Sequence, residues 1–278
     1  MTIFDAAPND GRLAAYGLDR ADDRQAALDA IETDSPAWAA EPASAVLQAR
    51  RGSGLEEDLA WISAGLDAAY LAGRADVLAR LWGLLRAQPV SQSPLLATLG
   101  PDAAAGYLAM AVIAGDWTEA RAVARALRPG LEAAEDEVAP EAPHLARAMA
   151  ALVLGDPQGI AAARTAIRAL PRPRGQDGLI LDCARATADL LEATARPDGP
   201  GLARSLAALN LARAALVGQS LDAIRKGRPW LLLPGMFWDR SATAALAAAG
   251  MLGLPAPPPS PFADLDFCRA ALAGTEHS

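Results

Sequence analysis

The sequence contains very few of the residues from which active sites and metal sites are usually built. It has two histidines, two cysteines and a single lysine, Lys226. His277 is the penultimate residue and His144 follows a proline, so neither has a partner that marks it as a general base. Cys183 and Cys268 lie too far apart in the chain to indicate a disulfide framework or a zinc knuckle. We therefore expect no metal site and no cofactor.

The familiar catalytic motifs are missing as well. The sequence has no glycine-rich dinucleotide motif, no P-loop and no Gly-x-Ser-x-Gly nucleophile elbow. Glu132 and Asp136 are one helical turn apart, but they belong to a run of acidic residues, which is typical of a solvated face. We expect a protein that is not an enzyme, and we keep catalysis by scattered Asp and Arg side chains as a third hypothesis.

Basic charge and long apolar runs are also scarce. The net charge of −8 argues against a nucleic-acid partner, because nucleic-acid surfaces need clustered Lys and Arg. The first ten residues have no basic region, so we expect no signal peptide. No apolar run reaches the roughly 20 residues that span a membrane. We expect a cytoplasmic protein without a membrane partner.

Alanine accounts for most of the apolar content. Apolar residues make up 52% of the chain although aromatics make up only 5%, and β-branched residues are sparse. Alanine has the highest helix propensity, whereas β-branched residues favour strands. The composition therefore predicts an all-α fold.

The middle of the chain shows three similar units. Apolar residues spaced by three and four predict helix pairs at 55–72 with 77–87, at 102–114 with 117–127, and at 142–154 with 158–170. The turns contain Gly73, Gly115 and Gly155, which recur about every 40 residues, a period typical of helical repeats. We expect Arg128-Pro129-Gly130 to end the fourth of these helices. The pattern predicts antiparallel helical hairpins stacked as an irregular bundle or as a tetratricopeptide-like repeat array.

The two ends of the chain differ from this middle part. Short helices are predicted at 20–31 and 44–51, followed by a possible hinge at Gly52-Ser53-Gly54. Further helices are predicted at 179–195, 202–224 and 239–251. We interpret residues 1–278 as one helical domain, with a less regular part at 1–52, stacked helix pairs at 53–224 and a C-terminal cap with a proline-rich loop at 225–278.

Two features suggest a surface for a protein partner. Acidic clusters near residues 19–23 and 132–141 would attract a basic partner, although they equally suit ordinary solubility. Aromatic residues near 230–238 are the type that anchors interfaces, or they cap the core. The candidate partner-binding residues are Asp19, Asp22, Asp23, Glu132, Glu135, Asp136, Glu137, Glu141, Trp230, Phe237 and Trp238.

The C-terminal part resembles a known family. Trp238-Asp239, the run Leu246-Ala247-Ala248-Ala249-Gly250-Met251-Leu252-Gly253-Leu254-Pro255, the turn Ser260-Pro261 and a final helix ending near Leu272 are similar to the end of immunity family 49. That family comprises all-helical immunity proteins of bacterial polymorphic toxin systems. The proline run at 257–259 and the segment 264–268 depart from its pattern. The resemblance implies a cytoplasmic antitoxin that blocks a toxin domain.

These observations leave several partner hypotheses. The first is an immunity-type inhibitor that uses a surface and no cofactor to block a toxin domain, and a basic toxin domain would suit this acidic chain. The alternative is a helical-repeat scaffold or regulator that binds cellular proteins or peptides. Alanine-rich faces would also support a homodimer.

Overall fold

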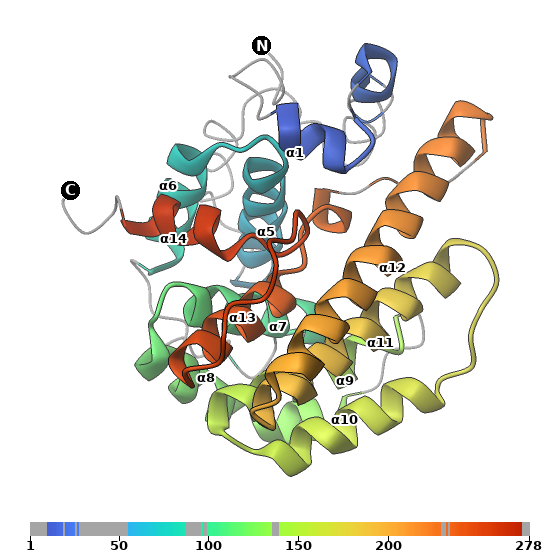
Figure 1. Ribbon diagram of the computed structural model, residues 1–278. Helices are drawn as coiled ribbons and strands as arrows, with labels where there is room; N and C mark the ends of the chain where they lie inside the picture. Colours follow the sequence, from blue (N-terminus) through green and yellow to red (C-terminus); the bar gives the residue numbers. More distant parts are fainter. Residues whose placement is uncertain are drawn as a thin grey trace.

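The computed structural model describes residues 10–18, 20–25, 27, 55–86, 96, 99–134, 139–228, 232 and 234–273. These residues form helices and no strand, and consecutive helices pack as antiparallel hairpins (Figure 1). The all-α prediction is confirmed. The predicted helix at 44–51, the hinge glycines and Trp230 lie outside the described residues.

The helices follow the chain in pairs. The bounds are α1 (Asp10–Ala15), α5 (Leu55–Leu71), α6 (Ala75–Arg86), α7 (Pro101–Ile113), α8 (Trp117–Ala133), α9 (Ala142–Leu154), α10 (Pro157–Ala169), α11 (Gln176–Ala195), α12 (Gly199–Arg225), the 3-10 helix η3 (Pro234–Met236), α13 (Arg240–Met251) and α14 (Leu265–Ala273). Residues 21–25 and 27, within the predicted helix at 20–31, are helical. The hairpins α7–α8, α9–α10 and α11–α12 lie side by side, and α13 and α14 pack back onto α7 and α6.

The turns between paired helices follow the predicted chemistry. Gly73, Gly115 and Gly155 all have a positive φ, the left-handed conformation that glycine adopts without strain. Asp116 and Asp156 cap the helices that follow, since their carboxylates accept hydrogen bonds from backbone N–H groups in the first turns of α8 and α10. Local sequence therefore determines where each hairpin turns.

One predicted helix end was wrong. Helix α8 continues through Pro129 to Ala133 and does not end at Leu127. Proline removes one backbone N–H and disfavours a helix interior. Here the turn beyond Pro129 is held from outside, because the Arg147 guanidinium of α9 donates hydrogen bonds to the carbonyls of Leu131 (2.6 Å) and Ala134 (2.6 Å).

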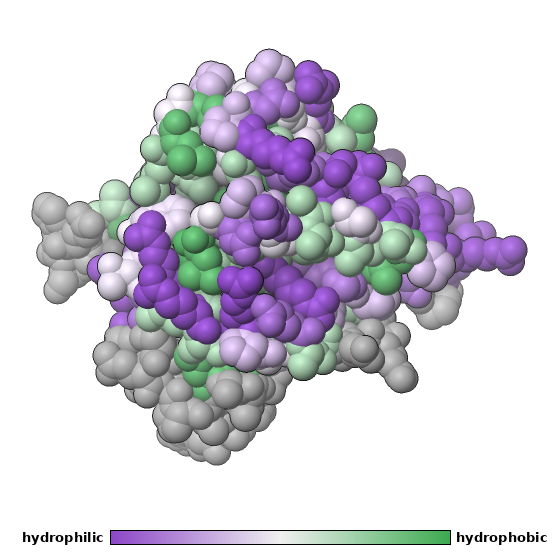
Figure 2. All heavy atoms as spheres, turned by 90° about the horizontal axis from the view of Figure 1, so that it is seen from below, coloured by the Kyte–Doolittle hydropathy of each residue, from purple (hydrophilic) through white to green (hydrophobic). Residues whose placement is uncertain are grey.

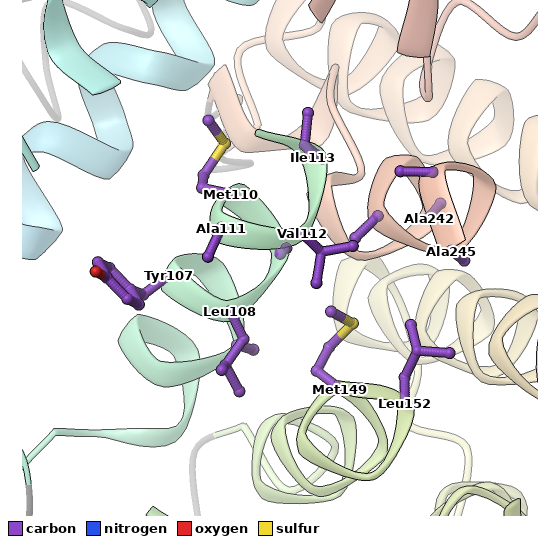
Figure 3. Close-up of a cluster of buried hydrophobic side chains, with 14 of the residues drawn as sticks. Tyr107, Leu108, Met110, Ala111, Val112, Ile113, Met149, Leu152, Ala242 and Ala245 are labelled. Carbon is purple, nitrogen blue, oxygen red and sulfur yellow. The ribbon is translucent and has the colours of Figure 1, made fainter. Parts of the chain in front are cut away.

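The main core surrounds α7. Every residue from Ala104 to Ile113 is buried, so the helix has no solvent face after its first turn. Figure 3 shows its side chains meeting Met149 and Leu152 of α9 on one side and Ala242 and Ala245 of α13 on another. Alanine is useful here because its small side chain lets helices approach closely on several sides at once.

A second cluster joins the two ends of the described chain. Tyr16, near the N-terminus, packs against Phe237 and Phe262 with ring centroids 5.2 and 5.3 Å apart. The hydroxyls of Tyr16 and Tyr70 both donate to the carbonyl of Pro261. Residues close to both ends of the sequence thus belong to one packed region.

Hydrophilic side chains cover much of the face seen from below, with hydrophobic patches between them (Figure 2). No helix in the described part of the chain has the length and apolar content needed to cross a membrane.

Candidate functional site

The acidic candidates have different environments. Asp22 is exposed, whereas Asp23 is buried and forms an ion pair with Arg225 of α12. A buried, paired carboxylate serves the fold and is not available to a partner. Asp19, together with Glu135, Asp136 and Glu137, lies outside the described residues.

Glu132 and Glu141 mark the two ends of the acidic segment at 132–141. Glu132 is exposed in the last turn of α8 and accepts a hydrogen bond from Arg128 Nε at 3.0 Å. Glu141 is half-buried immediately before α9. The acidic segment therefore connects α8 to α9, and both of its ends lie near the same hairpin junction.

The aromatic candidates in the described region are core residues. Phe237 is 0% exposed and Trp238 is 2% exposed. The Trp238 ring stacks on Tyr70 with centroids 4.5 Å apart, and its Nε1 donates to Thr243 Oγ1 at 3.0 Å. The structure thus corrects their interpretation as surface anchors: a hydrophobic cluster and a satisfied indole hold them inside, which agrees with the alternative that they cap the core.

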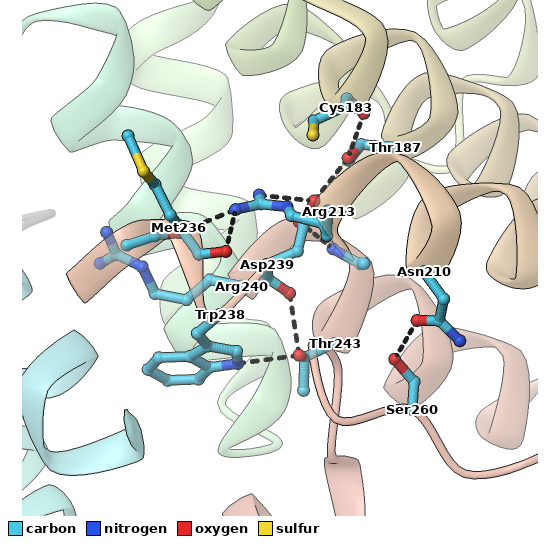
Figure 4. Close-up of polar contacts among 12 residues, drawn as sticks. Cys183, Thr187, Asn210, Arg213, Met236, Trp238, Asp239, Arg240, Thr243 and Ser260 are labelled. Carbon is cyan, nitrogen blue, oxygen red and sulfur yellow. Dashed lines mark hydrogen bonds and ion pairs between the residues drawn. The ribbon is translucent and has the colours of Figure 1, made fainter. Parts of the chain in front are cut away.

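Next to Trp238 lies a buried polar cluster that joins four elements (Figure 4). Arg213 of α12 donates from Nη2 to Asp239 Oδ2 at 2.9 Å and from Nη1 to the carbonyl of Gly235 at 2.8 Å. Asp239 also accepts from Thr187 of α11 and caps α13 through the Ala242 N–H. These contacts hold α11, α12, η3 and α13 together.

A second ion pair adjoins this cluster. Arg240 Nε lies 3.3 Å from Asp67 Oδ1 in an ion pair, and Arg240 Nη2 donates a hydrogen bond to Asp67 Oδ2 at 3.5 Å. Burial raises the pKa of Asp67 to about 6, although Arg240 and Arg213 act in the opposite direction. The nearby Cys183 thiol is also buried, which raises its pKa to about 11. A thiol of this kind stays protonated near neutral pH and is a poor nucleophile.

The buried cluster combines Asp and Arg side chains, the residue types that the third hypothesis invokes. Its charged groups are directed toward one another and toward backbone carbonyls, so the arrangement is suited to joining helices. Within the described ranges, no three His, Cys, Asp or Glu side chains come together as metal ligands would.

A pocket of about 250 Å³ opens between α8, α9 and α10. We call it the α9 pocket. Its floor is apolar and consists mainly of small residues: Leu131, Ala150, Ala151, Leu154, Gly159, Ala162, Ala163 and Ala166. Its rim is charged or polar and comprises Arg128, Glu132, His144, Arg147 and Asp156. An apolar floor with a few polar groups around it is typical of a binding pocket.

The rim of the α9 pocket is held in place by its own contacts. Arg147 reaches two carbonyls at the end of α8, and its Nη1 lies 3.0 Å from His144 Nδ1. Burial, and then the Arg147 charge, lower the pKa of His144, so its ring is neutral at neutral pH. Arg128 contacts Glu132 at 3.0 Å and Asp156 at 3.4 Å. The positive and negative charges on the rim therefore balance.

Glu132 is the one residue of this pocket that was predicted from the sequence as a partner-binding residue. Arg147 was missed because its role depends on carbonyls more than ten positions earlier in the chain. A signal for the floor was present in α10, where Gly159, Ala162, Ala163 and Ala166 place small residues on one helix face at spacings of three and four. Such a face leaves space where larger side chains would fill it.

A comparison of the chain with models of known protein families, with curated proteins and with solved structures found no match. The resemblance of the C-terminal part to immunity family 49 stays a prediction.

Proposed function

We propose that this chain is an immunity-type inhibitor that binds a toxin domain through the α9 pocket and the acidic segment beside it. The observation that supports this proposal is their adjacency: Glu132 belongs both to the pocket rim and to the acidic segment. In protein interfaces, the residues that contribute most of the binding energy commonly fill such pockets, and the contacts around them exclude water.

The floor of the α9 pocket determines what enters it. Alanine and glycine leave a hollow that is large enough for one bulky apolar side chain and offer it few polar groups. Interface anchors are commonly Trp, Tyr or other large side chains that become fully desolvated in such pockets. We therefore expect the partner to insert one apolar or aromatic side chain between α8 and α10.

The surroundings of the α9 pocket determine the charge of the partner. The rim is balanced, but the segment at 132–141 contributes further acidic residues and the whole chain carries a net charge of −8. Complementary charge mainly raises the association rate and selects the partner. A basic surface around the inserted side chain is therefore the best fit, and association should slow as salt is added.

The first test is co-expression with the product of the adjacent gene. We expect the native chain to bind this product and to restore growth when the product is toxic. No binding and no rescue would exclude this neighbour as the target and would place the scaffold function first.

The second test examines the pocket itself. Ala162→Phe fills the exposed side of the floor, whereas Thr165→Phe adds the same side chain to α10 outside the pocket. Filling the pocket should raise Kd at least about tenfold and abolish rescue, while the control should behave as the native chain. Equal binding by both variants would rule out the α9 pocket.

A second candidate function is a scaffold that binds cellular proteins or peptides. It is favoured by the lateral stacking of the hairpins α7–α8, α9–α10 and α11–α12, since stacked hairpins form the extended surfaces of helical-repeat proteins. A peptide that binds the native chain but not Ala162→Phe, with no toxic neighbour, would support this alternative.

A further inference from the structure

Helix α12 has a long outer face whose middle part carries no charge. Its centre is Leu211, whose side chain is 74% exposed, an unusual position for a large apolar residue. Ala208 lies three positions before it and Ala215 four positions after it, so the three residues share one side of the helix. Ala207 and Gly218 border this face and are exposed as well.

The opposite side of α12 packs into the core of the protein. Leu206, Leu209 and Leu216 are buried there. Arg213 reaches inward to Asp239, so the one charged residue in the middle of α12 is directed away from the Leu211 face. Figure 1 shows α12 on the outside of the helical assembly. On the Leu211 face, Leu211 and Ala208 are exposed, whereas Ala215 is half-buried where it meets the second core cluster.

Each end of this face carries one charge, and the two charges are opposite. Arg204 lies toward the start of α12 and Asp222 toward its end, about five helical turns apart and therefore on the same side as Leu211. Their side chains are 74% and 55% exposed. Leu211 and Ala215 lie on either side of the midpoint between them. When a second α12 lies antiparallel to the first, the positive end of each helix therefore lies beside the negative end of the other.

We infer that α12 packs against α12 of a second copy of this chain, antiparallel and around a two-fold axis near position 213. In this arrangement Leu211 packs beside Ala215 of the second copy, and Arg204 faces Asp222 of the second copy at both ends. A two-fold interface must be self-complementary. This distribution of charged and apolar residues meets that requirement. Small side chains on either side of Leu211 allow close helix contact.

The existing contacts of the two charged residues permit this exchange. Arg204 lies 3.8 Å from Asp198, and Asp222 lies 2.6 Å from Lys226 within the same helix. Both are exposed ion pairs, which contribute little to stability and re-form readily with other partners. The contact between single helices is small for a dimer, so we expect reversible association at micromolar protein concentrations.

Sedimentation equilibrium over a range of concentrations tests the apolar part of this interface. The native chain should dimerise, and Leu211→Arg should raise the dimer Kd at least about tenfold. Leu252→Arg is the matched control, because Leu252 is also exposed but lies at the end of α13. A monomeric native chain, or equal effects of the two variants, would overturn the inference. Circular dichroism confirms that both variants are folded.

A charge exchange tests the antiparallel arrangement. Arg204→Asp alone and Asp222→Arg alone each place like charges opposite each other twice in the homodimer, so both variants should be mainly monomeric. Mixing them in equal amounts pairs opposite charges at both ends and should restore dimers as mixed species. Absence of mixed dimers would overturn the antiparallel register. Because Ala162→Phe leaves α12 unchanged, dimerisation and toxin binding can fail independently.

Discussion

Arg213 and Asp239 form an ion pair inside the protein, with Arg213 Nη2 2.9 Å from Asp239 Oδ2. The arginine comes from the middle of α12, and the aspartate caps α13. Both side chains are largely shielded from water, so each charge depends on the other and on nearby hydrogen bonds. This contact joins the last hairpin of the stack to the helices of the C-terminal cap.

Replacement of Arg213 by methionine removes the charge and keeps much of the side-chain volume. We expect the free energy of unfolding to fall by about 3–5 kcal/mol, because the Asp239 carboxylate remains buried without its counter-ion. Urea denaturation followed by circular dichroism measures this loss. Arg168→Met removes an exposed contact to Asp189 and should cost less than about 1 kcal/mol. Equal losses for the two variants would contradict the structural role of Arg213.

Asp67 should make stability depend on pH in an unusual direction. Burial raises its pKa from 3.8 to about 6, so between these values the folded chain holds a proton that the unfolded chain has lost. The favourable contribution of this group is therefore complete below pH 3.8 and is lost as the pH rises to about 6. A shift of this size corresponds to about 3 kcal/mol.

Asp67→Asn should remove this dependence. Relative to the variant, the native chain is expected to lose about 2 kcal/mol of unfolding free energy as the pH rises from 4 to 7, because part of the full change already occurs below pH 4. Denaturation at several pH values measures the change. Asp76→Asn is a control of opposite sign, since a hydrogen bond from Arg74 lowers the pKa of Asp76. A pH-independent difference for Asp67→Asn would refute the assignment.

Trp238 should matter for stability and not for binding. Trp238→Ala removes a buried ring that stacks on Tyr70, so we expect a loss of about 3–5 kcal/mol. Trp238→Phe keeps a ring and loses the hydrogen bond to Thr243, at a cost of about 1 kcal/mol. The affinity of folded Trp238→Phe for the partner should equal that of the native chain in calorimetry. A large loss of affinity would restore Trp238 as an interface anchor.

The helices were predictable because their signals are local. Capping aspartates, glycines at left-handed turn positions and apolar spacings of three and four all act within a few residues of the chain. The exception is the end of α8, where Pro129 indicates a stop and Arg147 of the next helix prevents it. Such a contact depends on the packing of two helices, and no local pattern contains it.

The candidate site was harder to predict for a related reason. Charge and aromatic content were visible in the sequence, but exposure was not: Asp23 and Trp238 are buried, whereas Leu211 is exposed. Exposure depends on which helices pack against a residue. The α9 pocket arises in the same way, since the small side chains of α9 and α10 do not fill the space beside α8.

Arg147 connects the fold to the α9 pocket, and its removal should affect both. Arg147→Met leaves the carbonyls of Leu131 and Ala134 without their donors, so the turn of α8 that follows Pro129 should fray. We expect a stability loss of about 2–3 kcal/mol and weaker partner binding, because Leu131 and Glu132 form one wall of the pocket. Hydrogen exchange at the amides of residues 131–134 should accelerate in this variant. Arg125→Met is the control, since Arg125 is an exposed arginine of α8 without an ion pair to any described residue. Unchanged exchange at 131–134 in Arg147→Met would show that α8 continues past Pro129 without help from α9.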